Sequence, residues 1–571
     1  MHSAAPRSNR RYLWAAMEEA GLPSSWRASI WRDAERNSVS QIEINNDWLV
    51  SRVVAIRRIS PRLPVDASND DVKAEARRLA AECQDSIYRK DHHGGARVIV
   101  QSYALDWPGS ARAVCERWWK RNLGRLLDTR TEEAARALGH VGGRGDRYVS
   151  EQTHMRKLGQ RKASERAINA GLLVEESGEE YDLKAAIDAS ISNPKLRRAE
   201  LMTRIKGCEV IAASCGHVGL FVTLTCASPF HPVRADGSRN ELWHGETVKD
   251  GQGDLLAKWA RVRARWAKRG LPVYGLRVAE PHRSGTVHWH AMIFVHADHV
   301  RRVLGHLLRV FRADYRNVPS RASLQHRVQV VRIDPSKGTA AGYVAKYVSK
   351  NIDGHGLEEA DKTGARRVRS WASAHRIRQF TFIGGPPVGV WREVRRMHAS
   401  DAAIANDTLQ AAFTAVNKRD TEQADWSRFV VANGGIHCPR VKRPIQLERE
   451  FSVSWSAYGE PVLWRLRGVR CGLQVVDTRV KRWAVLWGGK RAGATGGEAA
   501  HSRTRVNNCN RRLLVTDKTY GHDDFKKSQL LDIGLENWLS DATNDVEKSV
   551  RGYRRGKVPG AGRGGTVEGH Y

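Results

Sequence analysis

The sequence has 571 residues, with 95 Lys and Arg against 62 Asp and Glu, so its formal net charge is +33. An excess of this size attracts polyanions over long range. Charge alone fits a ribosomal or packaging-type protein equally well, but 41% hydrophobic residues over this length, enough for roughly three or four domains, supplies material for packed cores.

No apolar stretch is long enough to span a membrane, and the N-terminus lacks the apolar run of a signal peptide. The eight cysteines are scattered without a Cys-x-x-Cys pair. We therefore expect neither a disulfide framework nor a thiolate zinc site, and we expect reduced thiols in a cytoplasm.

Composition and pattern divide the chain into five regions. They are an N-terminal region of unknown role (1–110), a helical basic region (111–204), a region with regular periodicity (205–355), a basic helical extension (356–430) and a C-terminal region (431–571). In the last region, we expect the glycine-rich stretch 488–493 to be a flexible link and the Gly/Arg-rich end after Val550 to be disordered.

Two adjacent tryptophans, Trp118 and Trp119, lie in the helical basic region. Neighbouring side chains on a helix point in different directions, so we expect at least one of them in a core. The other is a candidate for stacking on nucleic-acid bases.

Residues 205–355 predict the order β-α-β-β-α-β followed by one more helix. The expected segments are strand 219–226, helix 254–270, strands 273–280 and 288–296, helix 297–315, strand 327–334 and helix 340–352. This order matches the ferredoxin-like (split βαβ) arrangement, an α+β fold with an antiparallel sheet.

The two helices between the predicted strands have recognisable apolar faces. In the first helix we expect Asp254 as the N-cap and Trp259, Val262 and Trp266 on the buried face. In the second helix we expect a buried stripe at four positions: Val300, Leu304, Leu307 and Phe311.

The triplet His288-Trp289-His290 lies on one predicted strand. Side chains alternate along a strand, so both imidazoles project from one face, roughly 6.6 Å apart along it. An isolated His-x-His triplet is usually a chance pair of exposed histidines without a function. If the hairpin is regular, however, Glu280 pairs directly with His288, and a carboxylate joins the two imidazoles.

Tyr343 and Tyr347 lie four residues apart on the last predicted helix, roughly 40° apart around its axis, with Lys350 on the same edge. Such a pair is by default a packing pair, but a separate apolar stripe already supplies packing: Val344, Val348 and Ile352. Lys346 and Lys350 make the tyrosine edge cationic. A lysine beside a phenol favours the ionised, nucleophilic form.

Three segments, 221–232, 280–290 and 343–354, resemble in order the three motifs of HUH-type rolling-circle initiators. More closely, they resemble the bacteriophage replication gene A protein family, and the resemblance covers about residues 110–400. It implies that 205–355 is an HUH endonuclease domain with helical basic flanks. His288, His290 and Glu280 would then hold Mg²⁺ or Mn²⁺, and Tyr343 and Tyr347 would be the nucleophiles.

The resemblance further implies a site-specific single-strand endonuclease and strand transferase. It would nick one strand at a replication origin, leave a 5′-phosphotyrosyl link and a free 3′-OH primer, and rejoin strands at termination. The implied partners are single-stranded origin DNA and a host helicase and DNA polymerase in a bacterial cytoplasm, with no membrane. Lys346 and Lys350 would contact DNA phosphates.

Three alternatives stay open at this point. A conjugative relaxase or single-strand transposase would share the nicking chemistry. A non-catalytic DNA-binding protein could use the histidines in a structural zinc site, although such a site normally has four protein ligands and three candidates are visible. A two-His-one-carboxylate iron oxygenase would need neither the paired tyrosines nor the large positive charge.

Overall fold

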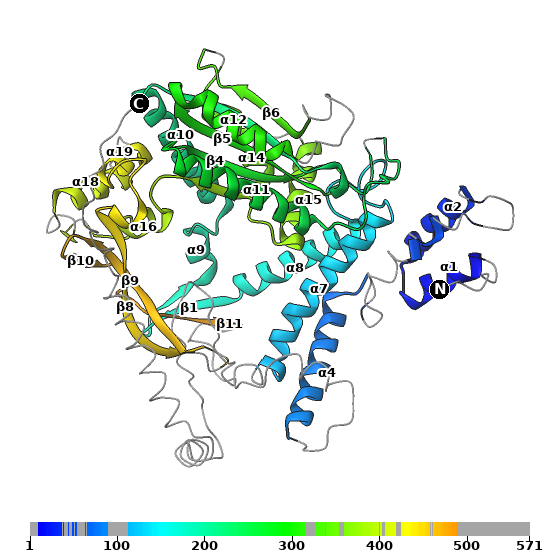
Figure 1. The fold of residues 1–571 in the computed structure, drawn as a ribbon. Helices are drawn as coiled ribbons and strands as arrows, with labels where there is room; N and C mark the ends of the chain where they lie inside the picture. Colours follow the sequence, from blue (N-terminus) through cyan, green and yellow to red (C-terminus); the bar gives the residue numbers. More distant parts are fainter. Residues whose placement is uncertain are drawn as a thin grey trace, which may run out of the picture. The chain divides into compact units, whose positions relative to one another are not determined.

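The computed structural model describes residues 9–487, apart from internal gaps of which the longest are 54–62, 89–111 and 314–325. The predicted flexible link at 488–493 and the predicted disordered end lie outside the described residues. The chain has a mixed α and β structure with antiparallel sheets and many helices (Figure 1). Within the described residues, no helix combines the length and the apolar character that crossing a membrane requires.

A five-stranded antiparallel sheet forms the centre, in the order β6-β3-β5-β4-β7. Its strands are β3 (His217–Thr225), β4 (Tyr274–Pro281), β5 (Val287–His296), β6 (Val328–Arg332) and β7 (Phe380–Ile383). Four of these strands are close to the predicted segments. The edge strand β7 lies beyond the predicted set.

Helices cover both faces of this sheet. On one face, α11 (Val248–Lys268) and α12 (Val300–Phe311) bury a layer that includes Trp289, Ala291 and Ile293 of β5. On the other, α10 (Pro194–Ser214) and α14 (Ala340–Ile352) bury a layer that includes Met292 and Phe294. The alternation of β5 between the two layers is the period of two that a strand requires.

The predicted start of the first helix is wrong. α11 begins at Val248 behind a capping box, in which Thr247 Oγ1 accepts from the Asp250 amide and the Asp250 carboxylate accepts from the Thr247 amide. Asp254 lies inside the helix and accepts from Lys258 Nζ at 2.7 Å. The expected buried face of Trp259, Val262 and Trp266 is confirmed.

The predicted stripe of the second helix is only partly right. A 3₁₀ turn, η2 (Ala297–His299), precedes α12, which ends at Phe311. Leu307 and Phe311 are buried, whereas Val300 and Leu304 are only partly buried. Val303 and Val310 complete the buried face instead.

The segments before the sheet are mainly helical. They are α1 (Asn9–Glu19), α2 (Ser24–Arg36), α4 (Asn69–Tyr88), α7 (Glu116–Ala137), α8 (Glu151–Asn169) and α9 (Leu183–Asp188), and the 3₁₀ turn η1 (Ser228–Phe230) follows β3. Trp119 of α7 is buried and Trp118 is partly buried against it, so the expectation of at least one core tryptophan is confirmed.

The chain beyond β6 adds further helices and the strands that complete two small sheets. The helical elements are α15 (Glu359–His375), α16 (Val388–Val394), α18 (Asp407–Val416), α19 (Trp426–Ala432) and η4 (Arg440–Lys442). One sheet has the order β10-β9-β8, with β8 (Ile445–Trp455), β9 (Pro461–Cys471) and β10 (Gln474–Asp477). The other, β11-β1-β2, pairs β1 (Gly171–Glu175) with β2 (Glu180–Asp182) and β11 (Trp483–Trp487).

Candidate metal and tyrosine site

The β4–β5 hairpin brings two imidazoles and a carboxylate together. Glu280 is the direct cross-strand partner of His288, as a regular hairpin predicts. The Nε2 atoms of His288 and His290 are 2.9 Å apart, and His290 Nε2 is 4.0 Å from Glu280 Oε2. Ligand atoms of all three side chains lie within 4.8 Å of one another.

The protonation of the two histidines suits metal binding. Burial lowers the pKa of His290 to about 3, helped by the positive charge of Lys350, and burial also lowers the pKa of His288 well below its usual value. His290 Nδ1 lies 3.1 Å from Thr223 Oγ1, so an Nδ1–H donated to this hydroxyl leaves the Nε2 lone pair facing the cluster. Neutral imidazoles are the form that binds metals.

The donor set is therefore two imidazole nitrogens and one carboxylate oxygen, which fits a divalent cation. Carboxylate ligands suit Mg²⁺ and Mn²⁺, whereas imidazole ligands suit Zn²⁺, Cu, Fe and Ni, so this mixed set is compatible with more than one divalent ion. Within the described residues this is the one group of three or more His, Cys, Asp or Glu side chains with such spacing, and a closed four-ligand site is not formed.

Glu280 is 1% exposed, and its carboxylate is held by the helix that carries the tyrosines. Asn351 Nδ2 donates to Glu280 Oε1, and Lys350 Nζ lies 3.3 Å from Oε2. Burial raises the pKa of Glu280, and these two partners oppose that rise. Asn351 also donates to the Tyr347 carbonyl at 2.7 Å and accepts from Gln379.

The two tyrosines lie at different distances from the histidines. The Tyr347 ring centroid is 4.3 Å from that of His290 and 5.4 Å from that of Phe221, whereas the Tyr343 ring is 6.4 Å from Phe221. Both tyrosines pack in part against the core beneath α14, and the predicted stripe of Val344, Val348 and Ile352 is buried. Tyr347 is thus the tyrosine adjoining the cluster.

Lys350 favours the ionised phenol of Tyr347, as expected, but two larger effects outweigh it. Burial and the Glu280 carboxylate raise the pKa of Tyr347, and Lys350 opposes them only in part. Lys350 is engaged by Glu280, since that is its nearest carboxylate. Lys346 is exposed on the outer edge of α14.

Tyr148 adjoins the site and was missed by sequence reasoning. Its backbone is left-handed (φ 74°), a conformation that costs a non-glycine residue of order 1–3 kcal/mol. Neighbouring hydrogen bonds hold it there: its amide donates to the Arg283 carbonyl at 3.0 Å, and Arg367 donates to the carbonyls on either side. The Lys350 ammonium lies 5.3 Å from the Tyr148 ring centroid.

A buried arginine from the helical basic region fixes the hairpin loop. Arg136 of α7 is 2% exposed and donates to the carbonyls of Phe230 (3.0 Å) and Ser284 (3.3 Å) and to Thr286 Oγ1 (3.1 Å). Because the loop joins β4 to β5, these bonds support the register that places Glu280 opposite the histidines.

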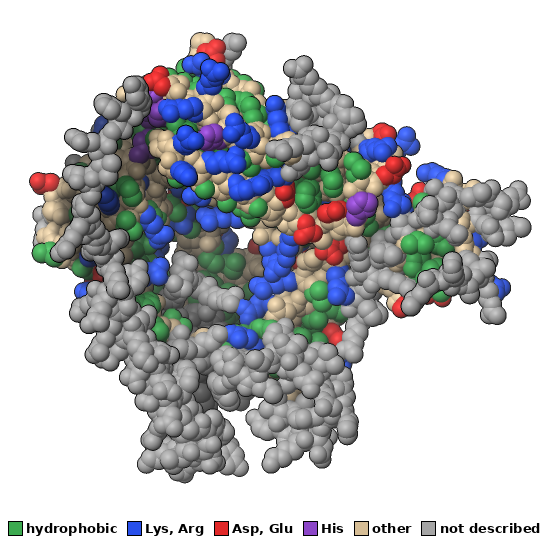
Figure 2. All heavy atoms as spheres, viewed as in Figure 1, with side chains coloured by type: hydrophobic (Ala, Val, Ile, Leu, Met, Phe, Trp, Pro, Cys, Tyr) green, Lys and Arg blue, Asp and Glu red, His purple; other side chains and the backbone are tan. Residues whose placement is uncertain are grey.

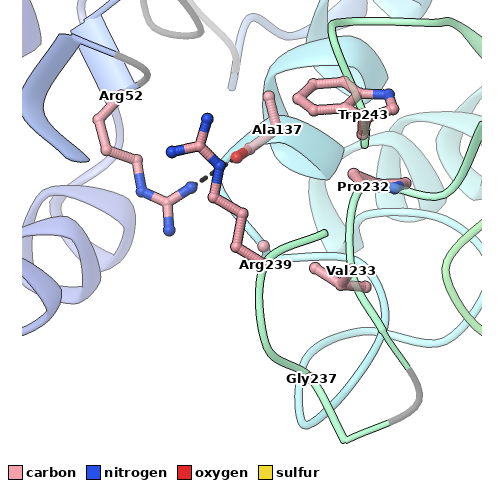
Figure 3. A pocket seen from close by; sticks show the side chains of 8 residues that line it. Arg52, Ala137, Pro232, Val233, Gly237, Arg239 and Trp243 are labelled. Carbon is pink, nitrogen blue, oxygen red and sulfur yellow. Dashed lines mark hydrogen bonds between the residues drawn. The ribbon is translucent and has the colours of Figure 1, made fainter. Parts of the chain in front are cut away.

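The cavity in Figure 3 lies away from this cluster. It is lined by Arg52, Ala137 and the loop containing Val233 and Arg239, and Arg52 donates to the Ala137 carbonyl at 2.6 Å. Its volume of about 50 Å³ holds little more than water. A nucleotide does not fit, so we place the chemistry at the hairpin and α14.

The model of the family described as "Bacteriophage replication gene A protein (GPA)" matches residues 102–355, the segment that contains Glu280, both histidines and both tyrosines. The replication gene A protein of Escherichia phage 186 is 35% identical over 421 residues, which cover 70% of this chain and 59% of that protein. The chain belongs to the bacteriophage replication gene A protein family.

Other relatives carry related names. A probable replication endonuclease from a prophage-like region of Salmonella typhi is 34% identical over 537 residues, covering 86% of this chain and 66% of that protein. Probable replication protein P12 of Pseudoalteromonas phage PM2 is 34% identical over 386 residues, covering 66% and 58%. The chain thus spans 58–66% of the length of these three relatives. No solved structure matches the chain.

Proposed function

We propose that this chain initiates phage-type replication by nicking one strand of origin DNA through tyrosine attack. The observation that carries the proposal is the convergence of Glu280, His288 and His290 beside Tyr347. A relative is named a replication endonuclease, which fits a nicking activity.

The topology supports an HUH-type, ferredoxin-like domain. The strands β3, β4, β5 and β6 stand in the order β6-β3-β5-β4, and each adjacent pair is antiparallel. A split βαβ unit produces this order, because β5 lies between β3 and β4, which α11 connects.

The chemistry is a transesterification. A divalent cation held by Glu280, His288 and His290 would polarise the scissile phosphate and offset its developing charge. The tyrosine oxygen forms a bond to phosphorus while the bond to the 3′-oxygen breaks. The phenolic proton is lost and the 3′-oxygen gains one, which leaves a 5′-phosphotyrosyl ester and a free 3′-OH. The reverse reaction rejoins the strand.

We further propose that Tyr347 attacks first, because its ring is next to His290 while Tyr343 lies one helical turn away, about 6 Å along the axis. Tyr343 would then accept the second strand transfer while Tyr347 is still esterified. Since burial raises the pKa of Tyr347, its proton must leave during attack and not before it.

The remaining assignments follow from charge. The exposed Lys346 would contact a DNA phosphate, whereas Lys350 would orient Glu280 in addition to any phosphate contact. A free 3′-OH is a primer, so a host polymerase and helicase would act next. A bacterial cytoplasm is the compartment where these partners occur.

The test is a covalent adduct. The protein is incubated with single-stranded DNA from its own origin and Mn²⁺, denatured, digested and mapped by mass spectrometry. We expect a phosphotyrosyl peptide at Tyr347 or Tyr343, and none from the double Phe variant. An adduct on another residue, or nicking without an adduct, would refute the mechanism. Complete inactivity with retained binding would favour a non-catalytic DNA-binding protein.

A further inference from the structure

The outer surface of α11 and α12 carries a group of arginines that the tyrosine chemistry does not use. We call it the α11–α12 basic face and define it by Arg261, Arg265, Arg269, Arg302 and Arg309. All five are exposed. Figure 2 shows Lys and Arg side chains gathered where Figure 1 labels these two helices.

Helical spacing aligns these side chains. Arg261, Arg265 and Arg269 are four residues apart and lie along one edge of α11, and Arg302 and Arg309 flank His306 on α12. Trp266 Nε1 donates to the Val303 carbonyl at 3.3 Å, which joins the two helices. Burial lowers the pKa of His306, and the positive charges of four of these arginines lower it further, so the four lie near that side chain.

The basic face lacks the acidic partners seen elsewhere. Among the described residues, none of its five arginines forms an ion pair, and the sequence from 255 to 270 contains no Asp or Glu. On α4, by contrast, Arg78 pairs with Glu75 and Glu82. Like charges four residues apart destabilise a helix, so a face that keeps them is suited to an external anion.

The face also lacks the features of a single-strand site. Proteins that bind single strands without sequence preference stack the bases on aromatic side chains. The aromatic residues of α11 and α12, Trp259, Trp266 and Phe311, are all buried in the layer beneath the sheet. What the surface offers is cations alone, which matches phosphate contacts to a duplex backbone, where each strand presents a charge about every 3.4 Å.

Its position separates it from the tyrosines. α11 and α12 cover the sheet face opposite the one that α14 covers, so the strand being cleaved cannot lie on both. We propose that the α11–α12 basic face is a second DNA-binding surface, which holds the backbone of duplex DNA beside the nicking site. The inference rests on the proposed nicking function for its role, but its binding test does not.

The test compares two variants of the full chain that lose equal charge. One replaces Arg265, Arg302 and Arg309 by Gln. The matched control replaces three basic residues of α4 by Gln: Lys73, Arg77 and Arg78. In the wild-type protein these three side chains form ion pairs with acidic residues on or beside α4. Affinity for a short labelled duplex of unrelated sequence is measured by fluorescence anisotropy over a series of salt concentrations.

We expect the slope of log K against log salt to become shallower by about 2.7 in the basic-face variant, at about 0.9 per phosphate contact. The α4 control should change it much less. Replacing the same three arginines by Lys should keep the slope, because the charge remains. Equal slopes in the basic-face and control variants would overturn the proposal. It would also be overturned if the basic-face variant lost as much affinity for single-stranded DNA as for the duplex.

Two further measurements keep the outcomes separate. Thermal unfolding should show no loss of stability in the basic-face variant, because repulsion has been removed. If the triple Gln variant is destabilised, single Arg→Gln substitutions replace it, each expected to make the slope shallower by about 0.9. Adduct formation on a short single strand should persist in the basic-face variant. If wild-type protein forms no adduct, the nicking function fails, while the salt slopes still decide the binding surface.

Discussion

Replacing Asn351 by Leu should uncouple the metal cluster from the tyrosine helix. Asn351 is 3% exposed and is the donor to Glu280 Oε1. Leu has a similar size but no donor, so a buried carboxylate oxygen loses a hydrogen bond. Bonds to charged groups contribute about 1.5–3 kcal/mol, and we expect the free energy of unfolding to fall by about that amount.

Metal affinity should fall more visibly than stability. Partners that orient a metal ligand typically change affinity by about 10–100-fold, and we expect a loss in this range for Mn²⁺. Isothermal titration with Mn²⁺ measures the affinity, and denaturant unfolding measures the stability. The nicking rate at saturating Mn²⁺ should also fall, because the same amide holds the Tyr347 carbonyl.

Asn417 provides a matched control. Its Nδ2 donates to the Phe413 carbonyl at 3.0 Å, four residues earlier, as Asn351 does to Tyr347. Asn417→Leu removes that local bond without touching Glu280 and should leave Mn²⁺ affinity unchanged. Wild-type Mn²⁺ affinity in a folded Asn351→Leu variant would refute the reasoning, and so would equal losses in both variants.

Three other outcomes can be checked with the nicking assay. His288→Ala or His290→Ala should abolish nicking and reduce Mn²⁺ affinity at least tenfold. Duplex affinity, measured by anisotropy, should stay mostly intact. Full nicking by either variant, with metal still required, would refute the assignment of these histidines as metal ligands. Tyr347→Phe should lose initial cleavage, whereas Tyr343→Phe should cleave and then fail to transfer the strand, as resolved on denaturing gels; the reverse pattern would exchange their roles. Tyr148→Phe removes only the hydroxyl near Lys350, so nicking should slow while the unfolding midpoint stays within error; an unchanged rate would make Tyr148 purely structural.

The strands and the tyrosine helix could be predicted because their signals are local. β4 and β5 begin and end within one residue of the predicted segments, and the helix 340–352 has the predicted bounds. The pairing of Glu280 with His288 followed from a short hairpin, in which the pleat fixes which side chains meet. The nature of the donor set was therefore readable before any tertiary contact was known.

The features that sequence missed depend on tertiary contacts. α11 begins six residues before the predicted start, and the prediction missed its first turns because they contain two poor helix formers, Gly251 and Gly253. Gly251 is packed closely there, since a Cβ at this position would lie only 3.1 Å from Cys226 Sγ. Close packing thus overrides poor helix propensity. Tyr148 reaches Lys350 across about two hundred residues, and no local pattern marks it. Asn351 gave a weak signal, as a polar residue four positions after Tyr347 on the buried side of the helix.

The two faces of the central sheet also explain how a strongly cationic protein can attract a cation. The divalent ion would bind where Glu280 supplies the local charge and Lys350 is already neutralised by it. The arginines of α11 and α12 lie beyond the sheet and a buried apolar layer, at an exposed surface where dissolved ions screen a charge over about 8 Å at physiological ionic strength. The sheet therefore keeps the exposed cations at a distance from the metal cluster, and the surrounding salt screens them, so polyanion attraction and metal affinity arise on opposite sides of one sheet.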